Sequence, residues 1–210
     1  MGYGTHRPAR DPAEPAESKE DTIPEATSAE NGTVEIEAIV VNYKVGDKVV
    51  YPHHGAGKVL KKEKKEMIGE VREYLTIKIL HNDMTVMVPS DSAGRAGLRR
   101  VIGEAEVERV LGVLRDDMSQ MPKNWNRRFK HNRDKMKTGD IFELAEVVRN
   151  LAIRDFQKGL STGEKQMFTR AKKILASELM YALDMEEKDA EDYLDDLLEE
   201  TNTERAGAAK

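Results

Sequence analysis

The chain has no cysteine among its 210 residues. Structural disulfides, thiolate metal ligands and cysteine nucleophiles are therefore excluded, and a reducing compartment such as the cytoplasm is expected. No apolar run approaches the roughly 20 residues needed to cross a bilayer, and the first residues lack the apolar block of a secretory signal. We therefore expect a soluble, cytoplasmic protein with no membrane partner.

Aromatic residues are also scarce, at 5% of the sequence, whereas charged residues make up 35%. The cores must therefore consist mainly of aliphatic side chains and methionine, under a highly charged surface. The length is sufficient for one or two domains, each with a core of its own.

The net charge of −5 hides an uneven distribution. Residues 1–40 carry nine acids against three bases, and residues 184–200 carry ten acids against Lys188 alone. Residues 122–175 instead carry fourteen Lys and Arg against six acids, a net charge of +8. The sequence thus predicts a basic, phosphate-binding module between acidic ends.

The hydrophobic pattern predicts an α+β protein. Residues 1–43 contain few large apolar side chains and are expected to form a disordered acidic extension. Residues 44–101 alternate with the two-residue period of short antiparallel strands, typical of a small twisted sheet or barrel. Residues 104–199 have helical periodicity and predict a compact helical domain, and residues 200–210 a disordered tail.

Local signals place elements within these domains. Strands are expected at residues 48–52, 57–66, 71–80 and 84–88, and helices near 104–114 and 122–136. Three later helices are predicted to begin where a capping residue precedes a glutamate by three positions: Asp140 with Glu143, Ser161 with Glu164, and Asp184 with Glu187.

No arrangement typical of a catalytic or metal site is found. His53 and His54 are adjacent, and adjacent strand residues point to opposite faces, so a role in lining a turn is favoured over metal binding. The segment from Gly55 to Lys58 lacks the spacing of a phosphate-binding loop and precedes a strand rather than a helix. We therefore expect no enzymatic activity, no cofactor, no metal and no small-molecule substrate.

The single tryptophan lies in a basic segment, Pro122-Lys123-Asn124-Trp125-Asn126-Arg127-Arg128-Phe129-Lys130. A flat apolar ring among cations and amides is typical of a side chain that inserts between base steps while cations hold phosphates. Alternatively, Trp125 begins an apolar stripe with Phe129 and Met136 and packs in the core. The residues alone leave both interpretations open.

Three separated segments carry a family resemblance: VGDKVVYPHHG at 45–55, PKNWNRR at 122–128 and GLSTGEK at 159–165. In this order they resemble the CarD family of bacterial RNA-polymerase-binding transcription regulators, and actinobacterial members in particular. The resemblance covers about Lys44 to Leu198.

The resemblance implies a Tudor-like β domain that binds the β subunit of RNA polymerase, followed by a helical domain that contacts promoter DNA. The family's tryptophan, which falls on Trp125, inserts into the minor groove at the upstream fork of the transcription bubble and stabilises the open complex. Binding to polymerase would also place the protein at the nucleoid. The basic residues beside the tryptophan are expected to hold the phosphate backbone: Lys123, Arg127, Arg128 and Lys130.

On the β domain, the family's polymerase-contacting basic positions fall on Lys65 and Met87. Lys65 keeps the charge but not the bidentate geometry of arginine, and Met87 cannot pair with an acid. Arg72 or Lys78 is a candidate replacement cation. For Lys65, a solvated strand face is the alternative interpretation.

The family normally begins a few residues before the Val45–Asp47 segment. Either this chain carries a true acidic extension, or translation of the native protein begins near Val41. We hypothesise the second, because residues 1–33 look structureless and a GTG codon for valine can start translation. The intact mass of the native protein tests this, because a mass that includes Met1–Val40 would reject it.

Two other functions are consistent with the sequence. The first is a stand-alone, sequence-independent DNA-binding or nucleoid protein, supported by a basic strand at Lys61, Lys62, Lys64 and Lys65. The second is an interaction scaffold whose acidic ends recruit basic partners.

Overall fold

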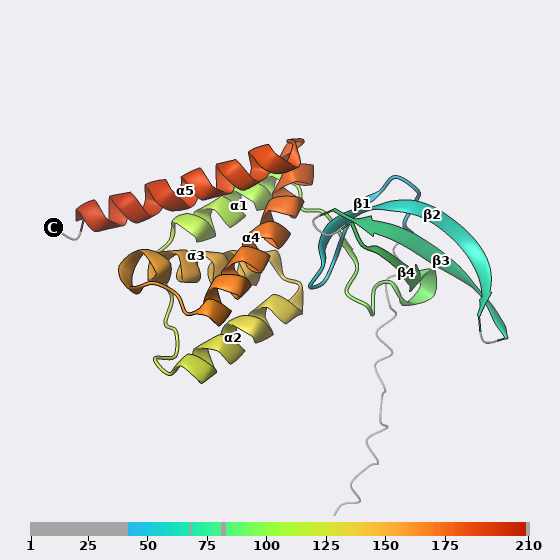
Figure 1. Ribbon diagram of the computed structural model, residues 1–210. Helices are drawn as coiled ribbons and strands as arrows, with labels where there is room; N and C mark the ends of the chain where they lie inside the picture. Colours follow the sequence, from blue (N-terminus) through green and yellow to red (C-terminus); the bar gives the residue numbers. More distant parts are fainter. Residues whose placement is uncertain (1–41, 68, 81–82, 209–210) are drawn as a thin grey trace, which may run out of the picture. The chain divides into compact units, whose positions relative to one another are not determined.

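The computed structural model describes residues 42–67, 69–80 and 83–208 (Figure 1). The predicted acidic extension, apart from Asn42 and Tyr43, and the hypothesis of a start near Val41 lie outside the described residues. So does His81, which is one of the residues of the predicted turn at 81–83.

The β domain is a five-stranded antiparallel sheet with the strand order β4-β3-β2-β1-β5 (Figure 1). The α+β prediction is therefore confirmed. Strand β5 has only two residues, too few to show an alternating pattern, and was not predicted. The strands are β1 (Lys48–Tyr51), β2 (Gly55–Met67), β3 (Glu70–Ile79), β4 (Thr85–Pro89) and β5 (Arg99–Arg100), with a 3-10 turn η1 (Ser90–Ser92) after β4.

Buried apolar residues at every second position of β3 form the centre of the core of the sheet. Leu75, Ile77 and Ile79 are fully buried, whereas the residues between them point to the opposite face. Tyr43 is also buried, and its hydroxyl donates to the carbonyl of Leu98 at 2.7 Å. The β domain therefore includes Tyr43, which the sequence-based boundary at residue 44 had assigned to the extension.

The helical domain consists of five helices. Asp140 caps the start of α3 by accepting from the backbone N–H groups of Phe142 and Glu143, as predicted. Ser161 forms the predicted capping box with Glu164 at the start of α4. The helices are α1 (Glu104–Arg115), α2 (Trp125–Thr138), α3 (Ile141–Lys158), α4 (Thr162–Leu183) and α5 (Glu187–Ala208).

Two predictions about the last helix were wrong. Asp184 does not cap the start of α5, because it ends α4 in the left-handed conformation at φ 54°. The predicted tail at 200–210 is helical as far as Ala208. Thr201 is buried there, and Arg205 donates to the carbonyls of Leu114 and Asp116 at the end of α1.

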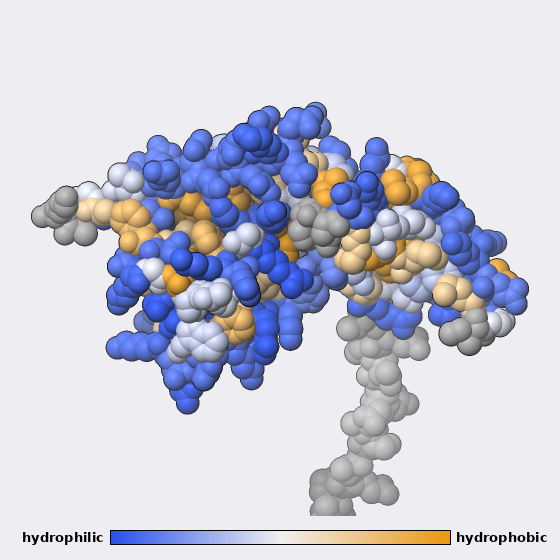
Figure 2. All heavy atoms as spheres, in the orientation of Figure 1, coloured by the Kyte–Doolittle hydropathy of each residue, from blue (hydrophilic) through white to orange (hydrophobic). Residues whose placement is uncertain are grey.

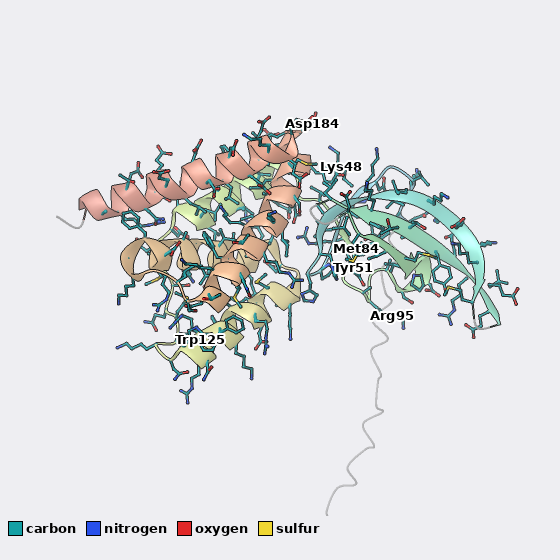
Figure 3. The ribbon with its side chains drawn as sticks, in the orientation of Figure 1. Lys48, Tyr51, Met84, Arg95, Trp125 and Asp184 are labelled. Atoms are coloured by element: carbon teal, nitrogen blue, oxygen red, sulfur yellow. The ribbon has the colours of Figure 1, made fainter. Side chains whose placement is uncertain are left out.

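The sheet and the helices share buried polar contacts. The carboxylate of Glu178 on α4 is 1% exposed and accepts from Arg99 of β5 at 2.8 Å and from the backbone N–H of Ile102 at 3.2 Å. The hydroxyl of Ser177 accepts from the backbone N–H of Ala56 at 3.0 Å. At the edge of this junction, Lys48 on β1 pairs with the Asp184 carboxylate at 3.4 Å (Figure 3). These contacts join the two domains through specific hydrogen bonds.

None of the helices in the described ranges combines the length and apolarity that crossing a membrane requires. Figure 2 shows mainly hydrophilic side chains along α5, in keeping with its many acidic residues, and more hydrophobic ones near its C-terminal end.

Candidate nucleic-acid interface

Trp125 is the first residue of α2, and its ring is both packed and accessible. Asn124 caps the helix by accepting from the backbone N–H of Arg127 at 3.2 Å. The indole stacks on Phe129 with ring centroids 5.2 Å apart, and 43% of the residue is exposed. Figure 3 shows it at the end of the helical domain. The core interpretation therefore applies to Phe129, which packs against the helical core, and not to the whole of Trp125.

A chain of hydrogen bonds fixes the polar edge of this ring. The indole Nε1–H donates to the hydroxyl of Ser161 at 2.9 Å, and that hydroxyl donates to Glu164 Oε2 at 2.8 Å. The other carboxylate oxygen, Glu164 Oε1, accepts from Arg128 Nε at 2.7 Å. The start of α4 thus orients a side chain at the start of α2.

The structure does not support the predicted phosphate contact of Arg128. Its side chain is 4% exposed, and besides Glu164 it donates to the carbonyls of Pro122 and Lys123, which lead into α2. Burial raises the pKa of Glu164, but hydrogen bonds from Arg128 and Ser161 outweigh it and hold the pKa below the ordinary value. Arg128 is therefore an internal support of the Trp125 segment, because its buried side chain is directed at Glu164 and at the carbonyls of Pro122 and Lys123.

The other three predicted phosphate-binding residues lie where DNA could reach them. Lys123, Arg127 and Lys130 are exposed and form no ion pair within residues 42–67, 69–80 and 83–208. The helix N-terminus adds partial positive charge at the same place. In Figure 2, hydrophilic side chains surround paler ones over this part of α2. We call Lys123, Trp125, Arg127 and Lys130 together the α2 surface.

The three predicted polymerase-contacting residues come together on one face of the sheet. Lys65 on β2 lies opposite Arg72 on β3, and Met87 on β4 lies opposite Thr76 on the same side of β3. The Lys65 ammonium is 3.9 Å from the Met87 sulfur. We call Lys65, Arg72 and Met87 the outer sheet face, because the other side of the sheet carries the core.

Cations on the outer sheet face have partners within the protein. Lys65 pairs with Glu63 at 2.9 Å, and the hydrogen bond from Lys65 lowers the pKa of Glu63. Arg72 donates to Glu70 at 2.8 Å, which raises the pKa of Arg72. Lys78, the other candidate replacement cation, pairs with Asp83 at 3.1 Å.

The basic strand that supported a stand-alone DNA-binding protein is not a single basic face. A β-bulge lies between Val59 and Lys61, and Lys61 and Lys65 then share the outer side of β2. Lys62 lies opposite the buried Leu75 and pairs with Glu73 at 3.1 Å. The four lysines are thus divided between the two sides of the strand, which removes that support.

Sequence reasoning missed the contact between Trp125 and Ser161. Ser161 could be identified as a helix cap from its local pattern, but its bond to the indole joins residues 36 positions apart. No local pattern reports such a contact.

Comparison with known proteins agrees with this architecture. The CarD C-terminal domain family matches residues 109–195, and the CarD-like/TRCF RID domain family matches residues 43–102. YdeB of Bacillus subtilis (strain 168), named as a candidate transcription factor, is 36% identical over 137 residues, which cover 65% of this chain and 90% of YdeB. The chain belongs to the CarD family.

Two solved structures are similar to parts of this CarD-family chain. The 72-residue N-terminal domain of Myxococcus xanthus CarD is 32% identical and covers 28% of this chain and 79% of its own, with a TM-score of 0.26. CdnLNt from Myxococcus xanthus is 39% identical and covers 30% of this chain and 90% of its own, also with a TM-score of 0.26.

The family resemblance expected from three segments is thus confirmed. The protein is a CarD/CdnL-like transcription regulator of a family without enzymatic activity, and its RID domain implies an interaction with RNA polymerase.

Proposed function

We propose that this CarD-family regulator binds the β subunit of RNA polymerase through the outer sheet face and promoter DNA through the α2 surface. In this proposal, Trp125 inserts into the minor groove at the upstream fork of the transcription bubble and stabilises the open complex. The protein would reach the nucleoid through its binding to polymerase.

The observation that carries the proposal is the state of Trp125. The residue is 43% exposed, while a hydrogen bond from its indole to Ser161 and a stack on Phe129 hold the orientation of the ring. A ring held in place before binding loses little conformational entropy when it inserts between bases. The exposed cations around it supply affinity for phosphates without reading sequence.

The same reasoning sets the size of the effect. A bound protein shifts an equilibrium only by its differential affinity for the two states, here the open and the closed promoter. Stacking of a base on an aromatic ring is worth about 1–3 kcal/mol, which corresponds to roughly a 5- to 150-fold shift toward the open complex. Such a protein modulates initiation and is not essential for each opening event.

Dissociation of open complexes tests the proposal. With Trp125→Ala, we expect retained polymerase binding and a lifetime shorter by about 5-fold or more, from the lost stacking. Phe156→Ala is the matched control, because Phe156 is an exposed aromatic residue on α3, outside the α2 surface. Equal lifetimes for the wild type and Trp125→Ala would reject the insertion of Trp125.

A further inference from the structure

A hollow of about 410 Å³ lies between α2 and α4, beside the ring of Phe129. One wall is the stripe of α2 at positions 129, 133, 136 and 137, and the other is the stripe of α4 from Gly163 to Arg170. His53, from the turn between β1 and β2, completes the lining. We call this hollow the α2–α4 trough.

The trough combines apolar and cationic side chains. Phe129, Met136 and Met167 supply apolar surface, and Arg133, Lys137 and Arg170 supply positive charge. None of the described residues that line it is acidic. This composition favours a nucleotide, which has a flat apolar base and a charged phosphate.

Two of these cations are available to a ligand. Arg133 and Lys137 are exposed and form no ion pair in the part of the chain that the structure describes. Arg170 is held at the far end by a bond from its Nη2 to the carbonyl of His53 at 3.0 Å. Positive charge is therefore fixed at one end and free along the α2 side.

The trough lies next to the ring that we propose to insert into DNA, because Trp125 stacks on Phe129, which lines the trough. Gly163 has no side chain, and a Cβ atom there would lie 3.4 Å from Phe129 Cε2 and 3.6 Å from Trp125 Cζ2. The missing side chain thus leaves both rings open toward the trough. A strand separated at Trp125 would meet the trough next.

The length of the trough sets the size of its ligand. The α2 stripe from Phe129 to Lys137 spans roughly 12 Å at a rise of 1.5 Å per residue. At about 3.4 Å per nucleotide, the rise of a stacked strand, this length corresponds to roughly three stacked nucleotides.

We infer that the α2–α4 trough binds the unpaired nucleotides of the strand that Trp125 separates, with bases against the apolar residues and phosphates at Arg133 and Lys137. This inference rests on the proposed function and names the path of the DNA beyond the fork. It makes the helical domain a binder of single-stranded as well as double-stranded DNA.

DNA with a single-stranded arm tests the inference directly. The affinity of the full chain is measured by fluorescence anisotropy for two DNAs of the same duplex sequence, one with blunt ends and one with a three-nucleotide single-stranded arm. The variant Arg133→Gln/Lys137→Gln removes the free cations of the trough. The control Arg115→Gln/Lys173→Gln removes the same charges at exposed positions of α1 and α4 outside the trough. Urea unfolding checks that both variants keep the wild-type stability.

We expect the arm to tighten binding by about 5-fold or more for the wild type and the control, and by clearly less for Arg133→Gln/Lys137→Gln, which keeps the apolar residues but loses the phosphate contacts. On the armed DNA only, that variant should lower the salt slope by about 1.4, because each single-strand phosphate contributes about 0.7. An equal gain from the arm in this variant, or an equal loss in the control, would overturn the inference.

Trp125→Ala separates this inference from the proposed function. If Trp125→Ala still binds the armed DNA more tightly than the unarmed DNA and has the wild-type open-complex lifetime, the trough is supported and insertion of Trp125 is rejected. If the wild type gains nothing from the arm although Trp125→Ala shortens the lifetime, the trough is rejected and insertion stands.

Discussion

The α2 surface and the outer sheet face carry the same kinds of side chain, two or more cations beside a large apolar residue, but differ in how the charges are paired. On the α2 surface, Arg127 and Lys130 have no acidic partner in the described ranges, and the apolar residue is a tryptophan of fixed orientation. On the outer sheet face, Lys65 pairs with Glu63 and Arg72 with Glu70. A phosphate can therefore bind the first surface without breaking an ion pair, whereas a partner of the second must exchange existing pairs.

This difference indicates which contacts depend on charge. Unpaired cations attract any polyanion and lose affinity steeply with salt. A surface whose cations are already paired is close to neutral, so it discriminates by shape and by the geometry of the exchanged pairs. The two surfaces thus suit a nucleic acid and a folded protein, respectively.

The adjacent arginines of α2 give the sharpest test of paired against unpaired charge. Arg128→Ala removes the 2.7 Å ion pair of the buried Glu164 and leaves it Ser161 and, at 3.7 Å, Arg154. We therefore expect a loss of about 3 kcal/mol in the free energy of unfolding, the low end of the range for a broken buried pair. Arg127→Ala should change stability by less than about 0.5 kcal/mol but lower the salt slope of duplex DNA binding by about 0.9. Urea unfolding measures the stability of each variant, and DNA titration at several salt concentrations measures its salt slope. If both variants unfold like the wild type, the buried ion pair is not the support described here.

Ser161 tests whether the orientation of Trp125 matters as well as its exposure. Ser161→Ala removes the acceptor for the indole N–H and a helix cap, and we expect a stability loss of about 1 kcal/mol. The open-complex lifetime should fall by less than it does for Trp125→Ala. Ser161→Thr keeps the hydroxyl and should restore both properties. A lifetime that Ser161→Ala leaves at the wild-type value would show that the ring needs no fixed orientation.

Lys65 offers the corresponding test on the outer sheet face. Lys65→Glu reverses a charge that is already paired, so we expect polymerase capture to weaken only several-fold, by about 1 kcal/mol. Lys64→Glu changes the neighbouring residue on the opposite side of β2 and should have little effect. Pull-down of the polymerase β subunit measures its capture by the Lys65→Glu and Lys64→Glu variants. Equal capture by both variants would remove Lys65 from the proposed interface.

The titration of Glu164 should have the smallest effect on stability near neutral pH. Its pKa is lowered in the folded protein, so its contribution to stability is complete above the unfolded value of about 4.3 and is lost as the pH falls through the folded pKa. We expect the wild type to lose more stability than Glu164→Gln between pH 5 and acid. Parallel pH profiles of the two proteins in urea unfolding would contradict this assignment.

Part of the fold and of the candidate site could be predicted from the sequence, and part could not. The strand alternation through Leu75, Ile77 and Ile79 and the caps at Asp140 and Ser161 are local patterns, and the structure confirms them. Such features depend on residues within a few positions of each other, where periodicity and capping chemistry act directly.

Other features depend on contacts between distant residues. Arg127 and Arg128 are equivalent in the sequence, and only the packing of α4 against α2 buries the second one beside Glu164. Asp184 has a side chain suited to a helix start, but aspartate also tolerates the left-handed conformation that ends α4. The length of α5 depends on Arg205, whose carbonyl partners lie about ninety residues earlier.

Entry of the Trp125 ring into separated DNA can be followed by the fluorescence of the protein itself, because Trp125 is its only tryptophan. Acrylamide quenching of its fluorescence can be measured on the full chain at saturating concentrations of forked or duplex promoter DNA. We expect forked DNA to protect the ring strongly from quenching and duplex DNA of the same sequence to protect it only weakly. Equal quenching of Trp125 in the free protein and in the fork complex would contradict entry of the ring into the DNA.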